Sequence, residues 1–547
     1  MSASETTFTP QADDYQLLIK QLLLTPLAHA PDQEIVYRDV ARYNYREFRE
    51  RIGRLSSGLA QLGIEKGDTV AVLDWDSHRY LECFFAVPMM GAVLQTVNIR
   101  LSTEQIQYTL EHAQPKILLV HRDFLGVIEP LRDALVSVRH IVVMSDDDND
   151  NGDSSDGYQS MLAEGSANFV FPDFNENTRA TLFYTSGTTG LPKGVYYTHR
   201  QIVLHTLAVT AAFAMPSEQG RFHRGDVYMP ITPMFHVHAW GMPYVATMMG
   251  VKQVYPGRYT PDGLLALRDR EGVTFSHCVP TILHMLLGEA QTSGRDLSGW
   301  KIVVGGSGLP KSLAQRGLDM GIDVFAAYGM SETCPFIASA QVDESMLGND
   351  DESAMVVRTA AGRALPLVDI QIVDDQMRRH AQGSAEVGEI VLRAPWLTAG
   401  YFRDEGASRD LWSGGYLHTG DIGTVDAGGY LRITDRLKDV IKTGGEWVSS
   451  YALEDLICRH PQVSEAAVVG VKDAKWGERP MALVVRKNGA GANLDAQEIQ
   501  RHLRALAETG LVSRYAVPDV VHFVDALPRT SVGKYDKKVM RTLYAQP

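Results

Sequence analysis

A short segment rich in hydroxyl, glycine and lysine residues follows an apolar run near the first third of the chain. Ala180–Tyr184 has the composition of a buried strand, and Tyr184–Gly194 reads YTSGTTGLPKG. Glycines let backbone N–H groups approach a phosphate, hydroxyls donate hydrogen bonds, and Lys193 supplies positive charge. A Walker A loop would instead need Gly-Lys-Ser/Thr after four variable residues. The segment therefore predicts an anion-binding loop rather than an ordinary polar surface loop.

Six further motifs carry polar or charged residues that could take part in chemistry. Asp421 can only accept hydrogen bonds, which suits two O–H donors, and Glu332 offers the carboxylate oxygens that Mg²⁺ prefers. Taken alone, Asp421 could form a turn, Tyr328 could be a core residue, and Lys534 would be a solvated surface lysine. In chain order, the motifs are Pro233–His236, Gly305–Gly308, Tyr328–Thr333, Tyr416–Asp421, Asp435–Glu446 and Pro528–Lys534.

Together, and in this order, the seven motifs resemble those of the AMP-forming acyl-CoA synthetases, within the adenylate-forming superfamily. The motifs span nearly the whole chain, so the resemblance does not depend on one local match. It implies two half-reactions. A carboxylate and MgATP give an acyl-adenylate and pyrophosphate, and the thiol of CoA then takes the acyl group and releases AMP. In this scheme ATP and CoA are co-substrates, and Mg²⁺ is the cofactor.

The resemblance also implies which residues bind the nucleotide. Tyr328 would stack on adenine, Asp421 would hold the ribose hydroxyls, and Thr185 and Glu332 would hold the metal ion. Ser331 stands where the family more often has threonine, and it keeps the hydroxyl. The implied ATP and AMP ligands are Thr185, Ser186, Gly187, Thr188, Thr189, Gly190, Lys193, Ser307, Gly308, Ala327, Tyr328, Gly329, Ser331, Asp421, Arg436 and Lys534.

Catalysis is implied to rest on Lys534, Glu332 and Thr185. An ammonium group near the α-phosphate stabilises the negative charge that gathers there when a carboxylate attacks. Lys438 falls at the family's hinge position, about which a C-terminal domain turns between the half-reactions. After that turn, Lys534 leaves and a second loop shapes the path of the CoA thiol. The residues of this path are Lys442, Gly444, Gly445, Glu446 and Trp447.

The acid pocket is implied to include His236, Trp240, Gly308 and Pro335. Adenylation starts from an ionised carboxylate and needs no base, so His236 is interpreted as a pocket wall. Trp240 is interpreted as a lid over a short pocket, with a core position as the alternative. The segment Met234–Pro243 resembles medium-chain fatty acid ligases and equally the ligases that activate 3-methylmercaptopropionate. Both favour a short or medium, apolar acid.

The surrounding elements must position these motifs. Short apolar runs alternate with amphipathic stretches along most of the chain, which predicts an α/β fold with largely parallel sheets. Thr69–Leu73 is predicted to be a strand, His78–Val93 a helix, and Ser102 the start of a capping box that opens another helix. We expect a large N-terminal domain of stacked mixed sheets with helices over residues 1–437, which holds the ATP and acid sites. A small, mobile α+β domain over residues 438–547 would carry the catalytic lysine.

The charge of the chain excludes some classes of partner. It has 547 residues with 52 basic and 66 acidic side chains, for a net charge of −14. A chain this acidic is a poor partner for nucleic acid or an anionic membrane. Its longest apolar stretch, at 202–214, is too short to span a bilayer. We therefore expect no nucleic-acid partner and no integral membrane contact.

Other features concern location and assembly. Six aspartates lie in Ser145–Tyr158, and we expect a solvated loop there. The spacing resembles an EF-hand loop until Tyr158, where calcium binding needs a glutamate. Four scattered cysteines and the absence of a signal peptide favour a cytoplasmic protein without a zinc site or disulfides. The oligomeric state stays open, with a homodimer as one option.

Three other functions stay open at this stage. An adenylating enzyme could load an acyl carrier protein, but no carrier domain follows Lys534, so free CoA is the expected acceptor. Luciferase-like oxygenation shares the fold, and no residue pattern here requires it. An inactive nucleotide-binding scaffold would have no need for the complete set of Thr185, Glu332, Asp421 and Lys534.

Overall fold

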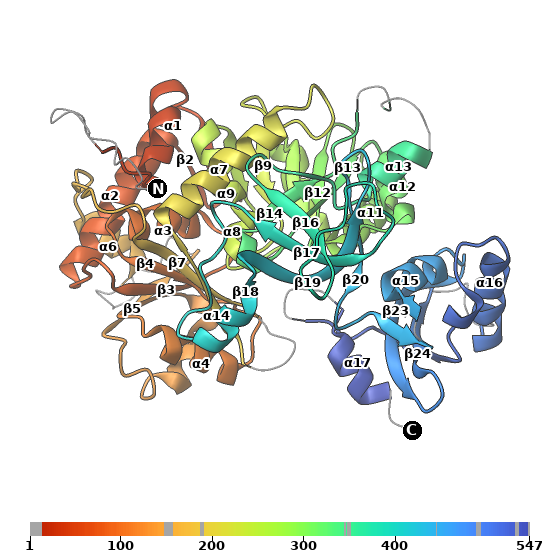
Figure 1. Cartoon of the computed structure of the whole chain (residues 1–547). Helices are drawn as coiled ribbons and strands as arrows, with labels where there is room; N and C mark the ends of the chain where they lie inside the picture. The colour runs from red at the N-terminus through yellow and green to blue at the C-terminus, as the bar shows by residue number, and fades with distance from the viewer. Residues whose placement is uncertain are drawn as a thin grey trace.

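The chain folds into a large N-terminal part and a smaller C-terminal domain that lies beside it (Figure 1). The computed structural model describes residues 14–146, 157–185, 191–343, 346, 352–444, 446–487, 494–530 and 535–544. Three sheets build the N-terminal part, and a fourth builds the C-terminal domain. Among the helices of these ranges, none is long and apolar enough to cross a membrane.

The largest sheet has nine strands. They are β1 (Glu34–Tyr37), β2 (Ala41–Asn44), β9 (Val227–Pro230), β10 (Lys252–Tyr255), β11 (Phe275–Cys278), β12 (Lys301–Val304), β13 (Asp323–Gly329), β14 (Phe336–Ser339) and β15 (Arg363–Ala364). Their order is β15-β14-β13-β12-β11-β9-β10-β1-β2, and the strands from β13 to β1 run parallel. The carboxyl ends of parallel strands share one edge, so the loops after β9, β11, β12 and β13 gather there.

A six-stranded sheet faces the first one across a layer of helices. Its strands are β3 (Thr69–Leu73), β4 (Val93–Thr96), β5 (Ile117–His121), β6 (His140–Met144), β7 (Arg179–Thr185) and β8 (Lys193–Thr198). Their order is β6-β5-β3-β4-β7-β8, and all neighbours are parallel except β7 and β8. The antiparallel β7–β8 hairpin brackets the predicted anion-binding loop.

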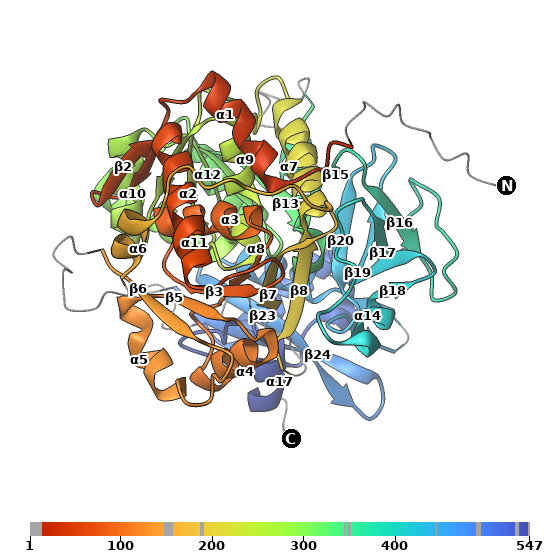
Figure 2. The ribbon, with the colours of Figure 1, turned by 90° about the vertical axis from the view of Figure 1, so that its left-hand side faces the viewer.

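Helices cover both sheets and fill the space between them. They are α1 (Leu24–His29), α2 (Tyr45–Gln61), α3 (His78–Met89), α4 (Thr103–Ala113), α5 (Leu125–Ile128), α6 (Tyr158–Glu164), α7 (His199–Ala214), α8 (Val237–Trp240), α9 (Met242–Met249), α10 (Pro261–Glu271), α11 (Pro280–Ser293), α12 (Lys311–Asp319) and α13 (Glu352–Arg358). Every residue of α3 is buried. This helix contacts β1 of the larger sheet and β3, β4 and β7 of the smaller one, and Figure 2 shows it with α2 above the six-stranded sheet. A helix buried on all sides suits a position between two sheets.

The expected helix over His78–Val93 is shorter in the structure. Helix α3 ends at Met89, Gly91 takes a positive φ of 89°, and Val93 begins β4. The left-handed glycine turns the chain from the helix into the strand without a break in the apolar sequence. Apolar periodicity alone therefore placed the end of this helix four residues too late.

Two other local predictions are confirmed. Thr69–Leu73 forms β3 with the predicted bounds. Ser102 accepts a hydrogen bond from the backbone N–H of Gln105 and begins α4 in a reciprocal capping box. Both features depend on neighbouring residues alone, which explains why the sequence predicts them well.

A small antiparallel sheet completes the N-terminal part. It consists of β16 (Asp369–Val373), β17 (Gly388–Arg393), β18 (Trp412–Ser413), β19 (Tyr416–Val425) and β20 (Leu431–Arg436), with α14 (Glu405–Leu411) beside it. Gly414 and Gly415, with φ of 57° and 77°, form the tight turn between β18 and β19. Strands β19 and β20 then lead the chain out of the N-terminal part.

The C-terminal domain has its own sheet and its own core. Its elements are β21 (Ile441–Thr443), β22 (Glu446–Val448), α15 (Ser450–Cys458), β23 (Val463–Asp473), β24 (Gly477–Arg486), α16 (Ala496–Glu508), β25 (Val520–Phe523) and α17 (Lys537–Tyr544). One face of the sheet packs on α15 and α16, and the other packs on α17. These apolar clusters contain no residue of the N-terminal part, as expected for a separately folded unit.

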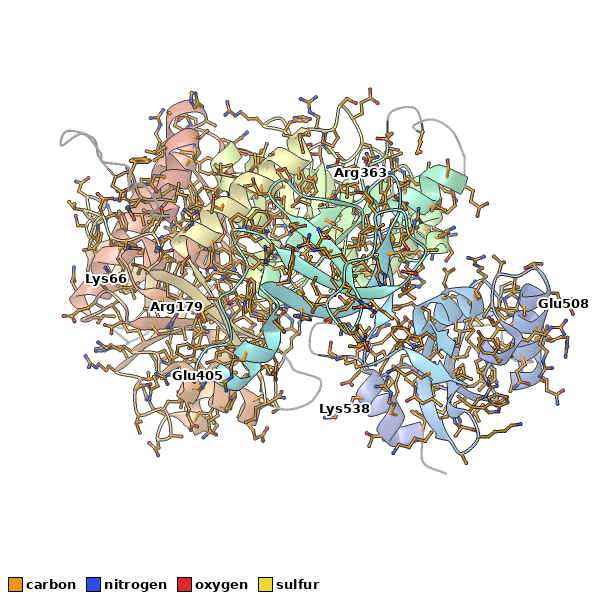
Figure 3. All side chains as sticks on the ribbon, viewed as in Figure 1. Lys66, Arg179, Arg363, Glu405, Glu508 and Lys538 are labelled. Carbon is orange, nitrogen blue, oxygen red and sulfur yellow. The ribbon has the colours of Figure 1, made fainter. Side chains whose placement is uncertain are left out.

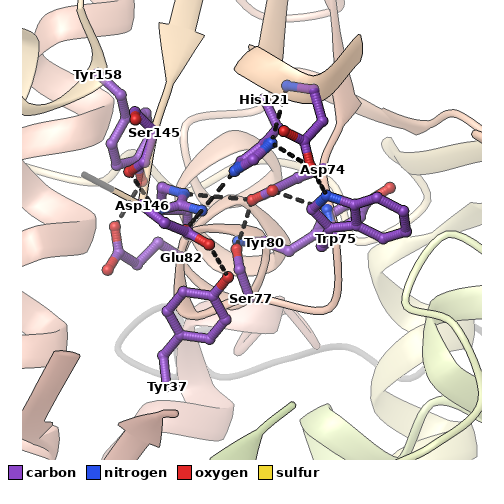
Figure 4. A network of polar contacts seen from close by, with 12 residues as sticks. Tyr37, Asp74, Trp75, Ser77, Tyr80, Glu82, His121, Ser145, Asp146 and Tyr158 are labelled. Atoms are coloured by element: carbon purple, nitrogen blue, oxygen red, sulfur yellow. Dashed lines mark hydrogen bonds and ion pairs between the residues drawn. The ribbon is translucent and has the colours of Figure 1, made fainter. Parts of the chain in front are cut away.

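Buried charges hold the layer between the two large sheets together (Figure 4). The Arg79 guanidinium on α3 lies 2.7 Å from Asp146 and 3.4 Å from Asp74. Burial alone would raise the pKa of Asp146, but hydrogen bonds from His121 and Arg79 lower it. Tyr37 also donates to this carboxylate at 2.8 Å. The first residues of the Asp-rich segment are thus anchored, while its residues 147–156 lie outside the described ones.

Charged side chains project outward from both parts of the molecule (Figure 3). Lys66 and Glu405 are exposed on the N-terminal part, and Glu508 and Lys538 on the C-terminal domain. Charge at such solvated positions costs little.

Candidate functional site

Tyr328 and Asp421 come together from two different sheets. The Tyr328 hydroxyl, at the carboxyl end of β13, donates to Asp421 Oδ2 at 2.7 Å. The Nε of Arg436 lies 3.4 Å from Asp421 Oδ1, because β19 and β20 pair at these two residues. Burial and the carboxylate of Asp421 raise the pKa of Tyr328 well above its usual value. The tyrosine therefore stays a neutral donor with a fixed ring, and Asp421 keeps unused lone pairs for further hydroxyl donors.

Glu332 lies just beyond Tyr328, in the short 3₁₀ turn Ser331–Thr333. Its side chain is buried, and Oε1 accepts a 2.7 Å hydrogen bond from the Tyr401 hydroxyl. Its backbone carbonyl accepts the N–H of Thr398 at 3.0 Å. The turn is tight because a Cβ at Gly329 would collide with the carbonyl oxygen of Pro335. The carboxylate is thus held in one direction by its own segment and by the segment around Tyr401.

The β7–β8 hairpin approaches the same tyrosine. Thr185 pairs with Lys193 across the hairpin, and the Lys193 ammonium lies 4.6 Å from the centre of the Tyr401 ring. The backbone N–H of Phe402 donates to the carbonyl of Gly194 at 2.8 Å. Tyr401 therefore joins the lysine of the predicted phosphate loop to Glu332. The loop residues Ser186, Gly187, Thr188, Thr189 and Gly190 lie outside the described ones.

Tyr401 is a site residue that the sequence analysis missed. It lies outside the seven motifs that carry the family resemblance, and a half-buried tyrosine is not unusual by itself. Burial and the neighbouring Glu332 raise its pKa, so it remains a hydrogen-bond donor. No spacing signal in the sequence marks it, because its partners are 69 and more residues away.

The oxygen donors at this place suit a hard divalent cation. No group of three or more His, Cys, Asp or Glu residues that could hold a metal occurs within the described ranges. A magnesium ion needs no such cluster, because it binds through one or two carboxylates together with substrate phosphates. The buried carboxylate of Glu332 beside the Thr185 hairpin is a donor set of this kind.

Trp240 is buried where three segments meet. Its ring centre lies 5.1 Å from that of His277 and 5.8 Å from that of Phe336. A Cβ built on Gly305 would lie 3.1 Å from the Trp240 ring. The side chain thus covers the carboxyl end of β12, at the entrance to the turn that contains Ser307 and Gly308, which are exposed. Pro335 is buried directly before Phe336.

The segment before Trp240 has an unusual backbone. Val237, His238, Ala239 and Trp240 all take positive φ values, between 41° and 59°, so α8 is a left-handed turn. Such a conformation costs non-glycine residues roughly 1–2 kcal/mol each. Packing opposes this cost, since the buried His238 ring lies edge-on between Phe84 and Phe183, at 5.6 and 5.3 Å.

The six-stranded sheet fixes the segment that precedes this turn. The backbone N–H of Met234 donates to Asp76 Oδ1 at 2.6 Å, and the Thr96 hydroxyl donates to the carbonyl of Phe235 at 2.9 Å. Burial raises the pKa of Asp76 to about 7. His236 follows directly and is half-buried. Asp76 and Thr96 are therefore positioning residues of the acid segment, and sequence reasoning missed both.

The predicted hinge and CoA-path residues lie at the junction with the C-terminal domain. Burial lowers the pKa of Lys438, whose carbonyl accepts a 3.4 Å hydrogen bond from Arg541 of α17. Lys442 and Trp447 are exposed on the β21–β22 hairpin, with the ammonium 5.6 Å from the indole. Gly444 takes a φ of 61° and donates its N–H to the Trp476 carbonyl. Gly445, the side chain of Glu446 and Lys534 lie outside the described positions.

The structure therefore brings together some of the predicted residues and not others. Tyr328, Asp421 and Arg436 form one group, and Glu332 meets the Thr185–Lys193 hairpin through Tyr401. Ala327 and Gly329 belong to the same strand, β13, and Ser331 accepts the Tyr197 hydroxyl at its carbonyl. The hairpin that carries Lys442, Gly444 and Trp447 belongs instead to the sheet of the C-terminal domain.

Comparisons with known proteins agree with this geometry. The AMP-binding enzyme profile matches residues 25–402, and the AMP-binding enzyme C-terminal domain profile matches residues 452–534. The long-chain-fatty-acid–CoA ligase of Thermus thermophilus is 40% identical over 519 residues, covering 94% of this chain and 93% of its own. The medium-chain-fatty-acid–CoA ligase of Ectopseudomonas oleovorans is 35% identical, covering 92% and 91%.

Two further matches cover the chain almost completely. The 3-methylmercaptopropionyl-CoA ligase of Ruegeria lacuscaerulensis is 36% identical, over 96% of this chain and 97% of its own. The crystal structure of ATP-bound MatB from Rhodopseudomonas palustris has a TM-score of 0.83 at 26% identity, over 97% of this chain and 99% of that one. The two family profiles and these matches lead to one conclusion: the chain belongs to the family of AMP-binding enzymes, as one of its acid–CoA ligases.

Proposed function

We propose that the protein activates an apolar carboxylic acid of short or medium length as an acyl-adenylate and then transfers the acyl group to CoA. One observation supports this proposal most strongly. Tyr401 contacts both Glu332 and Lys193, and Glu332 follows closely after Tyr328, which is hydrogen-bonded to Asp421. An acceptor for sugar hydroxyls, a carboxylate for a cation and a lysine for phosphates would thus meet beyond the carboxyl end of β13. Relatives named for medium-chain fatty acids and for 3-methylmercaptopropionate support the acid class.

In the first half-reaction, Asp421 would accept the ribose hydroxyls and Tyr328 would offer a ring face to adenine. Lys193 and the hydroxyls and N–H groups of Ser186–Gly190 would bind the phosphates, with Arg436 at their side. Glu332 and Thr185 would hold Mg²⁺, which neutralises phosphate charge when bound. Tyr401 directs Glu332 toward that place and keeps its own proton.

Lys534 is proposed as the catalytic lysine of this step. Its ammonium would stabilise the charge that develops when the carboxylate attacks the α-phosphate, and no covalent enzyme intermediate is needed. Arg529 and Tyr535, on either side of residues 530–534, form an antiparallel bridge, so these two residues lie next to each other.

The acid would bind against the segment that carries His236 and Trp240, with Gly308 and Pro335 nearby. Because Trp240 is buried against Gly305 and His277, its ring limits the depth that an acyl chain can use. We therefore place the preferred acid among short and medium chain lengths. The relative named for long-chain acids makes chain length the property to be measured first.

In the second half-reaction the C-terminal domain would turn about Lys438. This division into residues 1–437 and 438–547 is supported by the separate cores and by the passage from β20 to β21 at this place. The turn would exchange Lys534 for the hairpin with Lys442, Gly444, Gly445, Glu446 and Trp447, next to the path of the CoA thiol.

A screen of pyrophosphate release with ATP and Mg²⁺ tests the proposal. Acids from acetate to decanoate, palmitate, 3-methylmercaptopropionate and aryl acids are compared, with acyl-CoA measured by mass. We expect a maximum among apolar acids of three to ten carbons and strict dependence on a divalent ion. Product with palmitate alone would refute the acid class. Acyl transfer to a phosphopantetheinyl carrier protein but not to free CoA would refute the CoA ligase.

Assembly and location stay predictions. A homodimer would be recognised by its mass in solution, and a cytoplasmic location by fractionation of cells.

A further inference from the structure

Arg529 connects the C-terminal domain to the N-terminal part at the start of α11. Its Nη1 donates to the Thr281 hydroxyl at 2.8 Å, across 248 residues of sequence. Its Nη2 donates to both carboxylate oxygens of Glu465, on β23, at 2.8 and 2.9 Å. The guanidinium lies 4.9 Å from the centre of the Tyr535 ring. Glu465 and Tyr535 thus fix the plane and direction of the guanidinium within its own domain.

The acceptor on the other side belongs to the edge that carries the site. Thr281 is the second residue of α11, three residues after the end of β11 at Cys278. The Cys278 carbonyl accepts the N–H of Gly305, the glycine that Trp240 covers. Arg529 therefore reaches the loops at the carboxyl ends of β11 and β12.

Other groups of the two parts face each other around this bond. Burial lowers the pKa of His284 on α11, and the charges of Lys487 and Arg529 act in the same direction. Glu465 opposes them, so this carboxylate also lies near α11. The face of β23 around Glu465 is thus turned toward α11 in this structure.

The β21–β22 hairpin, by contrast, carries an exposed tryptophan, and a second one lies in the turn before β24. Trp447 is 47% exposed and Trp476 is 44% exposed. The hairpin bonds to β24 of its own domain through Thr443 and Gly477. The domain thus presents Arg529 and Glu465 toward α11, while Trp447 of the hairpin is exposed.

We propose that Arg529 is a positioning residue that holds the C-terminal domain in the orientation for adenylation, through its bond to Thr281. The inference rests on the proposed two-step function. In this orientation Arg529, five residues before Lys534, is held at the start of α11, directly after β11. Turning the domain must break the Arg529–Thr281 bond, whereas the bonds from Arg529 to Glu465 stay within the domain and turn with it. The bond therefore favours the first half-reaction and makes no contribution to the second.

Thr281→Val tests this most directly, because it removes the acceptor and changes no residue of the C-terminal domain. Thr281→Ser restores a hydroxyl, and Arg529→Gln removes the guanidinium. The matched control is Arg459→Gln, which removes the same charge from the same domain at an exposed pair with Asp455. Thermal unfolding of each purified full-length variant checks that it folds.

The two half-reactions are measured separately. Single-turnover pyrophosphate release reports adenylation, and acyl-CoA formation from preformed acyl-adenylate and CoA reports thioesterification. We expect Thr281→Val and Arg529→Gln to slow adenylation about three- to tenfold, as for the loss of one typical hydrogen bond. Thioesterification stays unchanged or becomes faster, the KM for the acid stays unchanged, and Thr281→Ser and Arg459→Gln behave like the unsubstituted enzyme.

The double variant Thr281→Val/Arg529→Gln tests whether the two single substitutions remove the same hydrogen bond or act independently. We expect it to be no slower in adenylation than Arg529→Gln alone. Unchanged adenylation in Thr281→Val, equal slowing of both half-reactions, or additive effects in the double variant would each overturn the proposal.

Small-angle X-ray scattering of the full chain reports the domain orientation independently of enzyme activity. We expect a larger radius of gyration for Arg529→Gln than for Arg459→Gln. Identical scattering curves for these two variants would also count against the bond as an orientation device. If the unsubstituted protein released pyrophosphate with no acid, the proposed function would fail, and the scattering comparison would still decide whether Arg529 orients the domain.

Discussion

At the scale of single residues, the site is built from side chains that set each other's direction and protonation. Tyr401 donates to Glu332 while its ring faces Lys193, and Tyr328 donates to Asp421. Both tyrosines have a raised pKa because burial and a carboxylate disfavour the phenolate. A carboxylate held by a neutral donor keeps its charge and loses its freedom to rotate, which prepares it for a cation or a hydroxyl.

Tyr401→Phe is expected to raise the Mg²⁺ concentration needed for adenylation more than it weakens ATP binding. The variant removes the donor to Glu332 Oε1 and leaves the ring near Lys193. Losing one such bond costs about 1 kcal/mol, so adenylation should slow about fivefold with a raised requirement for Mg²⁺. Magnesium titrations of pyrophosphate release measure this. Tyr430→Phe, which loses a bond to the Gln341 carbonyl far from the site, is the control. Equal magnesium curves for the two variants would contradict the role of Tyr401.

Trp240→Leu is expected to change the acid preference more than the KM for ATP. The smaller side chain opens space beside Gly305 and His277, so longer or bulkier acids should gain relative to short ones. Competition between butyrate and decanoate for one enzyme pool measures the ratio directly. If the ratio stayed the same while stability fell, Trp240 would be a core residue and not a lid.

At the scale of elements, the loop after β9 is fixed by neighbours from the six-stranded sheet. Asp76, after β3, and Thr96, in β4, hold the backbone of Met234 and Phe235 after β9. The left-handed turn Val237–Trp240 follows, and aromatic packing opposes its conformational cost. The sequence predicted the strands and the capping box, because these follow from neighbouring residues. It missed the Asp76 contact, which joins residues 158 apart.

Asp76 is expected to give the folding stability a specific pH dependence. Burial raises its pKa from 3.8 to about 7 in the folded state, so the folded protein binds this proton more tightly than the unfolded chain. The contribution of Asp76 to the free energy of unfolding is therefore present in full below about pH 4, and it is lost as the pH rises to about 7. Urea unfolding of the wild type and Asp76→Asn across this range measures it. We expect the variant to gain stability relative to the wild type as pH rises, with no further change above about pH 7.5. A pH-independent difference would contradict the assignment.

At the scale of the whole molecule, one face of the C-terminal domain is turned toward the N-terminal part and another toward solvent. Arg529 bonds to Thr281 across the interface, while Trp447 is exposed. A single orientation of this kind brings only one set of C-terminal residues to the site. We therefore expect the C-terminal domain to turn between the two proposed half-reactions.

Lys534→Ala is expected to separate the two half-reactions. Removing a positive group from the α-phosphate should slow acyl-adenylate formation at least about a hundredfold. Thioesterification from preformed acyl-adenylate should stay largely intact, because Lys534 is proposed to leave the site before that step. Stopped-flow measurement of each half-reaction tests this. Equal loss of both would refute the two-orientation scheme, and Lys538→Ala, an exposed lysine of α17, controls for charge.

The sequence by itself determined the reaction class, because that class needs short segments whose residues are consecutive. The loop at Thr185, the run from Tyr328 to Glu332 and the residues up to Asp421 can each be recognised without a structure. Tertiary structure alone decided how these segments meet. Tyr401, Asp76 and the Arg529–Thr281 bond act across sheets or domains, and their residue types are ordinary ones. Contacts between distant residues depend on packing and burial, which no local spacing records.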